Sequence, residues 1–144
     1  MKRIKGLCVL DVDGTLIEEE VIDLLGKEAG CEKEVALLTA QAMSGKLDFE
    51  SSLKKRVSLL KGVSIDVFDK IYHELHLSKN AAQFVRVLQE NQIEVGLVSG
   101  GFTAIVERLA KKLGISLFTA NQLEIEDDHL TGNLIGPIIS REVK

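Results

Sequence analysis

Cys8-Val9-Leu10-Asp11-Val12-Asp13-Gly14-Thr15 is the stretch of this chain that most constrains its fold, because a short apolar run ends there at two carboxylates and a glycine. In an extended chain residues i and i+2 point the same way, so Asp11 and Asp13 can face one small volume. Two like charges there repel each other unless a cation is present, and carboxylate oxygens suit Mg²⁺. Because Asp-Gly is also a common turn sequence, a metal site and a simple Asx-type turn both remain open at this point.

The composition indicates a soluble globular chain of 144 residues, long enough for one ordinary domain or a small core with an insert. Hydrophobic residues make up 45% of it and charged residues 28%, which argues against a disordered chain. The formal net charge is −4, with no Trp and one Tyr. A nucleic-acid partner is therefore not expected, because phosphate backbones are bound by clustered Lys and Arg, and bases by aromatic rings.

Neither a disulfide framework nor a membrane span is expected. Cys8 and Cys31 are too few for such a framework, which favours a cytoplasmic location. Lys2 and Arg3 precede an apolar run, but this run is too short for a signal peptide and ends in Asp11. No stretch approaches the length that crosses a bilayer, so we expect no membrane partner.

Apolar periodicity predicts a strand followed by a block of helices. Residues 7–10 form a short apolar run typical of a buried parallel strand. Between Thr15 and Ser78 the apolar residues recur at helical spacing in four segments, and no strand is expected there. Asp48 and Ser64 are the predicted N-caps of the third and fourth helices.

Strands and helices alternate in the second half of the chain. Residues 93–98 and 115–119 are predicted strands with a helix between them, and residues 123–126 and 130–134 form a predicted hairpin around Asp127-Asp128. Short connections from strand to helix to strand imply right-handed crossovers and a parallel sheet. The prediction is an α/β fold with a Rossmann-like parallel sheet and a helical insertion after the first strand.

A second polar turn, Ser99-Gly100-Gly101, follows a predicted strand and precedes a helix. Ligands of open parallel sheets bind beyond the carboxyl ends of the strands, where Asp11 and Asp13 are also expected. Glycines let backbone N–H groups approach an anion, so the turn suggests a phosphate site, although alone it also fits a tight turn. No G-x-G-x-x-G follows the first strand and no G-x-x-x-x-G-K-[ST] occurs, so a reacting phosphate is favoured over a bound nucleotide.

Together these motifs resemble the haloacid dehalogenase-like phosphatase superfamily, and within it the phosphoserine phosphatases. Asp11-Val12-Asp13-Gly14-Thr15 is similar to the first superfamily motif and Ser99-Gly100-Gly101 to the second. The resemblance to phosphoserine phosphatases extends over nearly the whole chain in one register. It includes Glu20-Val21-Ile22-Asp23, residues 42–49, residues 56–62, residues 97–103, Ala120-Asn121 and Leu130-Thr131-Gly132.

The resemblance implies covalent catalysis and a magnesium cofactor. Asp11 would be the nucleophile that forms an aspartyl-phosphate, and Asp13 the general acid and then the general base. Asp11 through its carboxylate and Asp13 through its backbone carbonyl would bind Mg²⁺. Ser99 and Gly100 would bind phosphoryl oxygens, and Lys144 resembles the lysine of the third motif.

The resemblance also implies four residues that recognise the substrate. Arg56 would bind the carboxylate of phosphoserine and Glu20 its ammonium group. Met43 and Phe49 would exclude water when a helical cap closes over the site. Without the resemblance, the same four residues fit ordinary core side chains and solvated charges.

The chain departs from the family at its end. The resemblance implies a partial core, residues 1–15 and 79–144, and a helical cap, residues 16–78. The family continues beyond the position of Lys144 through a fourth motif with paired Asp residues, one of which binds the metal. We therefore expect weaker metal binding, reduced catalytic competence and an unpaired apolar edge at residues 7–10. Such an edge would favour self-association or a complementing C-terminal segment, as in a fragment, a shortened paralogue or one half of an assembly.

The function that this resemblance implies is hydrolysis of O-phosphoserine to serine and phosphate, in serine biosynthesis, by a cytoplasmic Mg²⁺-dependent enzyme. Two alternatives stay open at this point. One is a phosphotransferase that passes the phosphoryl group to an alcohol such as homoserine. The other is a non-catalytic module that binds phosphate or serine. The sequence does not separate these alternatives, and it fixes neither the substrate among small phosphomonoesters nor the oligomeric state.

Overall fold

The computed structural model describes residues 3–140 of the chain. Four strands occur in this range: β1 (Gly6–Leu10), β2 (Ile93–Phe102), β3 (Leu117–Glu126) and β4 (His129–Ile135). They form one sheet in the order β1-β2-β3-β4, in which β1, β2 and β3 are parallel and β4 is antiparallel to β3. The predicted α/β class with a mainly parallel sheet is confirmed.

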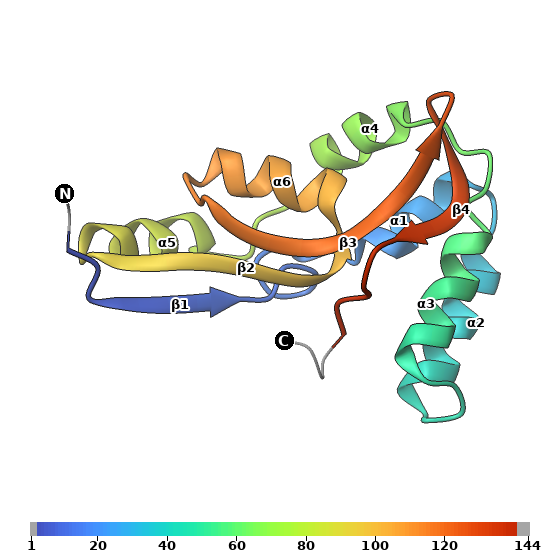
Figure 1. The fold of residues 1–144 in the computed structure, drawn as a ribbon, viewed down its shortest axis with the longest axis horizontal. Coiled ribbons are helices and arrows are strands. Elements are labelled where there is room, and N and C mark those ends of the chain that lie inside the picture. The colour runs from blue at the N-terminus through green and yellow to red at the C-terminus, as the bar shows by residue number, and fades with distance from the viewer. Residues whose placement is uncertain (1–2, 141–144) are drawn as a thin grey trace.

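Six helices lie in the same range of the chain. Four of them follow β1: α1 (Val21–Glu28), α2 (Glu32–Met43), α3 (Phe49–Ser58) and α4 (Asp66–Glu74). The other two are α5 (Ala81–Glu90), which precedes β2, and α6 (Thr103–Lys112), which connects β2 to β3. Figure 1 shows α5 and α6 on the same face of the sheet, whereas α2 and α3 extend away from one end of it. The predicted block of helices after the first strand is present, and its division from the sheet as a cap of residues 16–78 remains a prediction.

The two predicted helix caps make hydrogen bonds at the starts of their helices. The Asp48 carboxylate accepts a hydrogen bond of 3.0 Å from the Ser51 N–H in the first turn of α3. The Ser64 hydroxyl accepts one of 3.3 Å from the Asp66 N–H of α4, although Ile65 is the residue that directly flanks this helix. Both bonds satisfy N–H groups that the first turn of a helix leaves without an acceptor in the helix.

β2 extends further than the sequence predicts. The expected turn Ser99-Gly100-Gly101 lies within the strand, which continues to Phe102, and the register with β3 shifts at this point. Two hydrogen bonds accompany the irregular path. The Gly101 N–H donates to Ser99 Oγ at 2.8 Å, and the Gly100 carbonyl accepts from Asn121 Nδ2 at 2.9 Å. The polar segment is therefore an interruption of the strand pairing and not a turn that ends the strand.

β3 is one continuous strand where the sequence predicts two shorter ones. Its first half pairs with β2 and its second half pairs with β4. The predicted hairpin turn at Asp127 and Asp128 is confirmed, and their φ values of 51° and 61° belong to the two-residue turn whose twist matches the flanking strands. A strand that changes partners halfway along has no single alternation of apolar residues, which explains why the pattern suggests a break.

The β3–β4 hairpin is also bonded to the connection between α3 and α4. The Gly62 N–H donates to the Leu130 carbonyl and the Leu130 N–H donates to the Val63 carbonyl, both at 2.8 Å. The Ile65 N–H donates to the Asp128 carbonyl at 3.0 Å. Figure 1 shows the hairpin reaching from the sheet toward α3 and α4. The helical block is therefore attached to the sheet through the β3–β4 hairpin as well as through the chain segments at its two ends.

The two segments that join the helical block to the sheet pair with each other. We call them the linkers; they comprise residues 15–20 and 75–80. The Ser78 N–H donates to the Leu16 carbonyl, and the Glu18 N–H donates to the His76 carbonyl, both at 2.9 Å. The Glu19 carboxylate accepts a further bond of 2.9 Å from the His76 N–H. These bonds hold the linkers side by side.

Within residues 3–140, β1 is an edge strand of the sheet and pairs only with β2. The Leu7 and Val9 side chains are 62% and 52% exposed, and Leu117 of β3 is 50% exposed. A β-carbon added to Gly96, between these strands, would contact both Leu7 and Leu117. One face of the sheet thus presents neighbouring apolar side chains.

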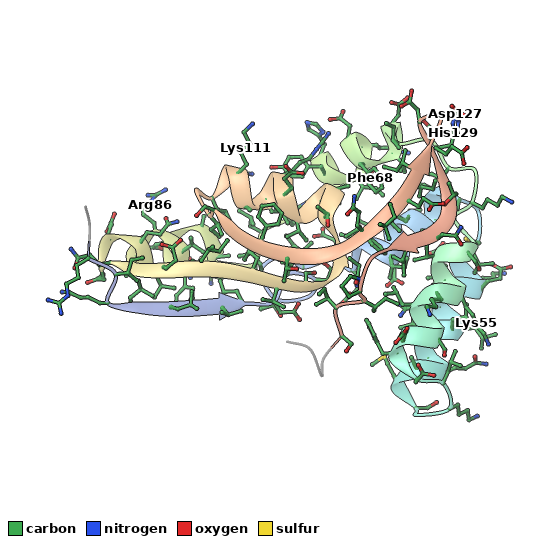
Figure 2. The ribbon with its side chains drawn as sticks, in the orientation of Figure 1. Lys55, Phe68, Arg86, Lys111, Asp127 and His129 are labelled. Atoms are coloured by element: carbon green, nitrogen blue, oxygen red, sulfur yellow. The ribbon has the colours of Figure 1, made fainter. Side chains whose placement is uncertain are left out.

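The outer surfaces of the helices carry solvated charges. Figure 2 shows Lys55 of α3, Arg86 of α5 and Lys111 of α6 pointing away from the body of the chain, and all three are exposed.

Among the helices of the described range, none combines the length and the apolar character that a membrane crossing requires.

The Glu19–His76 contact between the linkers depends on pH. A 2.6 Å contact joins His76 Nδ1 to the Glu19 carboxylate, and this hydrogen bond, with the carboxylate charge, raises the pKa of His76 above its ordinary value of about 6.5. Burial alone would raise the pKa of Glu19, but hydrogen bonds from the His76 backbone and ring outweigh it and lower that pKa. The contribution of the ion pair to stability is therefore fully present between about pH 4.3 and about pH 6.5, the ordinary pKa values of Glu and His. It is lost as the pH falls through the lowered pKa of Glu19 or rises through the raised pKa of His76.

We predict that Glu19→Gln lowers the melting temperature most near pH 5.5 to 6.5, because His76 is then charged in the parent chain. The difference from the parent should shrink as the pH rises through the raised pKa of His76, since a neutral ring no longer attracts the carboxylate. Circular dichroism melts between about pH 5.5 and about pH 8.5 measure this difference. His73→Ala is the control, because His73 contacts Asp69 of its own helix. A difference that stays constant over this pH range would contradict the prediction.

Candidate active site

A pocket of about 330 Å³ lies where the turn after β1, the end of β2 and the helices α1 and α3 meet. This is the end of the sheet at which open parallel α/β folds bind ligands, and the size suits a small molecule. The residues that line the pocket are Asp11, Asp13, Glu20, Ile22, Phe49, Leu53, Arg56, Gly100, Gly101, Phe102 and Ser140.

Parallel pairing of β1 with β2 brings the two predicted motifs together. Leu10, the last residue of β1, lies opposite Leu97, so the segments that follow them run side by side. A β-carbon on Gly101 would lie 2.9 Å from Asp13 Oδ1 and 3.0 Å from Ser99 Oγ. The Asp13 and Ser99 side chains therefore converge on Gly101, at a position where only glycine leaves enough room.

The two carboxylates of the first motif have different surroundings. Asp11 is exposed in the pocket, and its carboxylate accepts a hydrogen bond of 2.8 Å from the Val12 N–H. The Asp13 carboxylate accepts one of 3.0 Å from the Val21 N–H, at the N-terminus of α1. The partial positive charge of a helix N-terminus favours a carboxylate there. Both residues line the pocket, and Asp13 also connects the sheet to the first helix of the helical block.

A glycine turn brings Glu20 back to the pocket. Gly14 has a φ of +70°, a conformation that side chains disfavour, and a β-carbon on it would lie 2.9 Å from Glu20 Oε1. Glu20 directly precedes α1. Asp13-Gly14 thus forms a turn, which is one of the two interpretations of this sequence. The same turn brings the carboxylates of Asp11, Asp13 and Glu20 to one pocket.

Glu20 and Arg56 bring opposite charges to the pocket. Burial raises the pKa of Glu20, and the carboxylates of Asp13, Asp23 and Asp11 raise it further, whereas Arg56 lowers it. Burial lowers the pKa of Arg56, against the opposing effect of Asp23 and Glu20. Arg56 is only 6% exposed, and a guanidinium stays charged even so. A ligand that carries both a carboxylate and an ammonium group would find a countercharge for each.

Asn121 is a site residue whose role the sequence does not reveal. Its side chain is 1% exposed, donates to the Gly100 carbonyl at 2.9 Å and accepts from the Ile139 N–H at 2.6 Å. It thereby ties the end of β2 to the segment that leads to Ser140, and both Gly100 and Ser140 line the pocket. Asn121 lies between the strands predicted at residues 115–119 and 123–126, and sequence spacing cannot show which carbonyl its amide holds.

Of the remaining predicted site residues, the structure brings some to the pocket and not others. Phe49 lines the pocket and is 38% exposed. Ser99 is fully buried and is not a lining residue; its oxygen accepts the Gly101 N–H, which leaves the hydroxyl proton available for another acceptor. Met43, at the end of α2, is 85% exposed and is not among the lining residues, so the structure does not bring it to the pocket. Lys144 lies outside the described residues.

The sequence predicts only some of the apolar residues that line the pocket. Leu53 shares one face of α3 with Phe49 and Arg56 at helical spacing, which is a usable sequence signal. Ile22 and Phe102 have no such signal, because each also fits an ordinary core position. These side chains supply the apolar wall that limits the size of the pocket.

The residues present fit a magnesium ion. The Asp11 carboxylate offers hard oxygen ligands, and Gly101 leaves the space beside Asp13 clear of a side chain. Three carboxylates and one guanidinium line the pocket, so a phosphate would meet net negative charge unless a cation were bound. A second cluster, whose ligand atoms lie within 4.8 Å of one another, is in the linkers and not in the pocket; it consists of Glu18, Glu19 and His76.

The fold and this site define the class of protein: the chain belongs to the haloacid dehalogenase-like hydrolase family, whose profile matches residues 8–144. The chain is 50% identical to a phosphoserine phosphatase of Streptococcus thermophilus over 144 aligned residues. The alignment covers 100% of this chain and 67% of that protein.

The chain is also similar to solved structures of phosphoserine phosphatases. A substrate-bound phosphoserine phosphatase complex matches it with a TM-score of 0.90 at 37% identity, over 99% of this chain and 68% of that one. A phospho-aspartyl intermediate analogue of phosphoserine phosphatase matches with a TM-score of 0.86 at 40% identity, over 93% of this chain and 64% of that one. The chain thus spans about two thirds of the length of these relatives.

We predict that Gly101→Ala destabilises the fold by about 1–3 kcal/mol, the usual cost of overpacking a filled site. The added β-carbon would lie 2.9 Å from Asp13 Oδ1, so the carboxylate or the strand must move. Urea unfolding measures the change in free energy. Gly96→Ala, on the same strand, is the matched control, because its β-carbon comes no closer than 3.7 Å to a neighbour. Equal losses in the two variants would show that Gly101 is not a close-approach position.

Proposed function

We propose that this chain hydrolyses O-phosphoserine to serine and phosphate. The observation that carries the proposal is the composition of one pocket: Asp11, Asp13 and Gly100 line it, and Arg56 and Glu20 line the same cavity with opposite charges. The first pair suits phosphoryl transfer, and the second pair suits the carboxylate and ammonium groups of a phosphorylated amino acid. The named activity of the relatives, phosphoserine phosphatase, supports this choice of substrate.

In the proposed mechanism Asp11 is the nucleophile. One of its carboxylate oxygens attacks the phosphorus while the bond from phosphorus to the serine oxygen breaks, and Asp13 donates a proton to that departing oxygen. Water then attacks the phosphorus of the aspartyl-phosphate, Asp13 takes the proton of the water, and phosphate leaves with the Asp11 carboxylate restored. The solved intermediate analogue is named as a phospho-aspartyl species, which supports this route.

Phosphate recognition is proposed for the end of β2. Ser99 and Gly100 would hold phosphoryl oxygens, the former through the hydroxyl proton that its bond with Gly101 leaves available. Asn121 fixes the Gly100 carbonyl and thereby the direction of the backbone at this point. Magnesium held by the Asp11 carboxylate and the Asp13 backbone carbonyl would supply the positive charge that offsets the repulsion between nucleophile and phosphate.

The helices supply recognition of the serine part in this proposal. Arg56 would pair with the substrate carboxylate and Glu20 with its ammonium group, and Phe49 would exclude water from the reacting atoms. The role proposed for Met43 requires α2 and α3 to close toward the pocket, because Met43 now lies at the surface. Residues 16–78 would then act as a cap over a core formed by residues 1–15 and 79–144. The cytoplasm and serine biosynthesis are the proposed setting.

We predict that Asp11→Asn abolishes Mg²⁺-dependent phosphate release from O-phosphoserine, with a loss of at least about a thousandfold, because an amide cannot form the aspartyl-phosphate. Phosphate release is measured for the 144-residue chain and for a version extended with the corresponding C-terminal segment of the Streptococcus thermophilus relative. The extended version should be the more active. Asp127→Asn, at the hairpin turn, is the matched control and should leave the rate unchanged. Turnover that survives in Asp11→Asn would exclude this mechanism, and a phosphate ester formed on added homoserine would show phosphotransfer.

The exposed edge at β1 is the proposed surface for association with a second copy or with a complementing segment. Among residues 3–140, β2 is the one strand that pairs with β1; the other edge of β1 offers backbone hydrogen bonds to another strand, and Leu7 and Val9 add exposed apolar side chains. We predict that Val9→Lys weakens self-association of the 144-residue chain about tenfold or more in sedimentation equilibrium. Val87→Lys on α5, where Val87 is 48% exposed, is the matched control. A parent chain that stays monomeric would contradict the prediction.

A further inference from the structure

The Arg56 guanidinium is held by a second helix of the block. Arg56 belongs to α3, and its Nη1 donates to Thr39 Oγ1 on α2 at 3.3 Å. Its Nε donates to the Ser52 carbonyl one turn earlier on its own helix, also at 3.3 Å. A guanidinium has five N–H donors in one plane, so bonds at two of its nitrogens fix both the position and the tilt of that plane. Arg56 is 6% exposed and is one of the residues that line the pocket.

The Thr39 hydroxyl is oriented to accept from the guanidinium. Its oxygen lies 3.0 Å from the Val35 carbonyl, one turn earlier on α2, to which it donates its proton. With the proton used in that bond, the lone pairs of the oxygen are what it presents to Arg56. Thr39 is not among the lining residues of the pocket, so it acts on a ligand only through Arg56.

A separate hydrogen bond fastens α2 to α3 without involving the guanidinium. The Ser52 hydroxyl, which is fully buried, donates to the Leu38 carbonyl at 3.0 Å. The chain therefore offers two polar contacts between the same two helices. One positions Arg56, and the other only joins the helices, so their effects are separable by substitution.

We infer that Thr39 is a positioning residue that sets the preference of this site for phosphomonoesters that bear a carboxylate. This inference rests on the proposed function and extends it to a residue outside the pocket. Two parallel hydrogen bonds to a planar carboxylate require the guanidinium plane to be held in place, and a long unheld side chain loses that alignment. A phosphomonoester without a carboxylate makes no such demand on Arg56. Thr39 therefore contributes to selectivity and not to the chemistry at phosphorus.

The test compares two substrates that differ only in the carboxylate, O-phospho-L-serine and O-phosphoethanolamine. Thr39→Val keeps the shape of the side chain and removes the acceptor. It should raise KM for phosphoserine about tenfold with kcat changed less than about twofold, and leave both constants for phosphoethanolamine unchanged. Dissociation constants of the two compounds from calorimetry should follow the same pattern. Thr39→Ser, which keeps the hydroxyl, should restore the parent selectivity.

Ser52→Ala is the matched control for a merely structural effect. It removes the other contact between α2 and α3, so it should lower the melting temperature while the ratio of kcat/KM for the two substrates stays at the parent value. A Ser52→Ala chain that loses selectivity as Thr39→Val does would overturn the inference. So would equal effects of Thr39→Val on both substrates, or an Arg56 Nε–H that stays as ordered in Thr39→Val as in the parent by ¹⁵N relaxation. A parent chain that neither binds nor hydrolyses phosphoserine would instead refute the proposed function itself.

Discussion

The parallel pairing of β1 with β2 is the constraint on which the rest of the structure depends. It places Leu10 opposite Leu97, so the carboxylate turn that follows β1 lies beside the last part of β2, which carries Gly100. Side chains alternate along a strand, so a shift of one residue would turn Asp11 and Asp13 to the opposite face and separate them from the Ser-Gly-Gly segment. The burial of Leu97 against the helices above the sheet helps to fix this register.

Three sets of contacts hold the helical block in place, and the pocket lies where this block meets the sheet. One set is the pairing of the linkers with each other, and another is the set of backbone bonds from the β3–β4 hairpin to the connection between α3 and α4. A third contact, from the Val21 N–H to the Asp13 carboxylate, ties the first helix to the carboxylate turn itself. The position of α1, and with it Glu20, therefore depends on the same turn that holds the proposed acid. Through α3, Phe49 and Arg56 reach the same pocket from the other side.

The pocket collects charge that would be unfavourable in isolation. Burying Arg56 costs free energy unless its donors and its charge are matched, and here the Ser52 carbonyl, the Thr39 hydroxyl and the nearby Asp23 and Glu20 provide that match. Glu20 has the complementary problem, because burial and the surrounding carboxylates raise its pKa while Arg56 lowers it. A zwitterionic ligand and a divalent cation would each relieve part of this imbalance. The charges of the pocket thus favour a ligand of this class, and its volume of about 330 Å³ suits a small molecule.

The sequence by itself determined the features that depend on near neighbours along the chain. The strand that ends in Asp11 and Asp13, the Asp48 cap and the hairpin at Asp127 follow from local rules of side-chain alternation, capping and turn geometry. The family resemblance predicted which residues bind the substrate, and of these Glu20, Phe49 and Arg56 line the pocket.

Only the tertiary structure decided the contacts between segments far apart in the chain. It made β3 one strand with two partners, left Met43 at the surface, and placed Asn121 against Gly100 and Thr39 against Arg56. Such contacts depend on the packing of whole elements against each other, because the spacing of residues along the chain specifies which side of an element a side chain occupies but not which atom of another element will meet it.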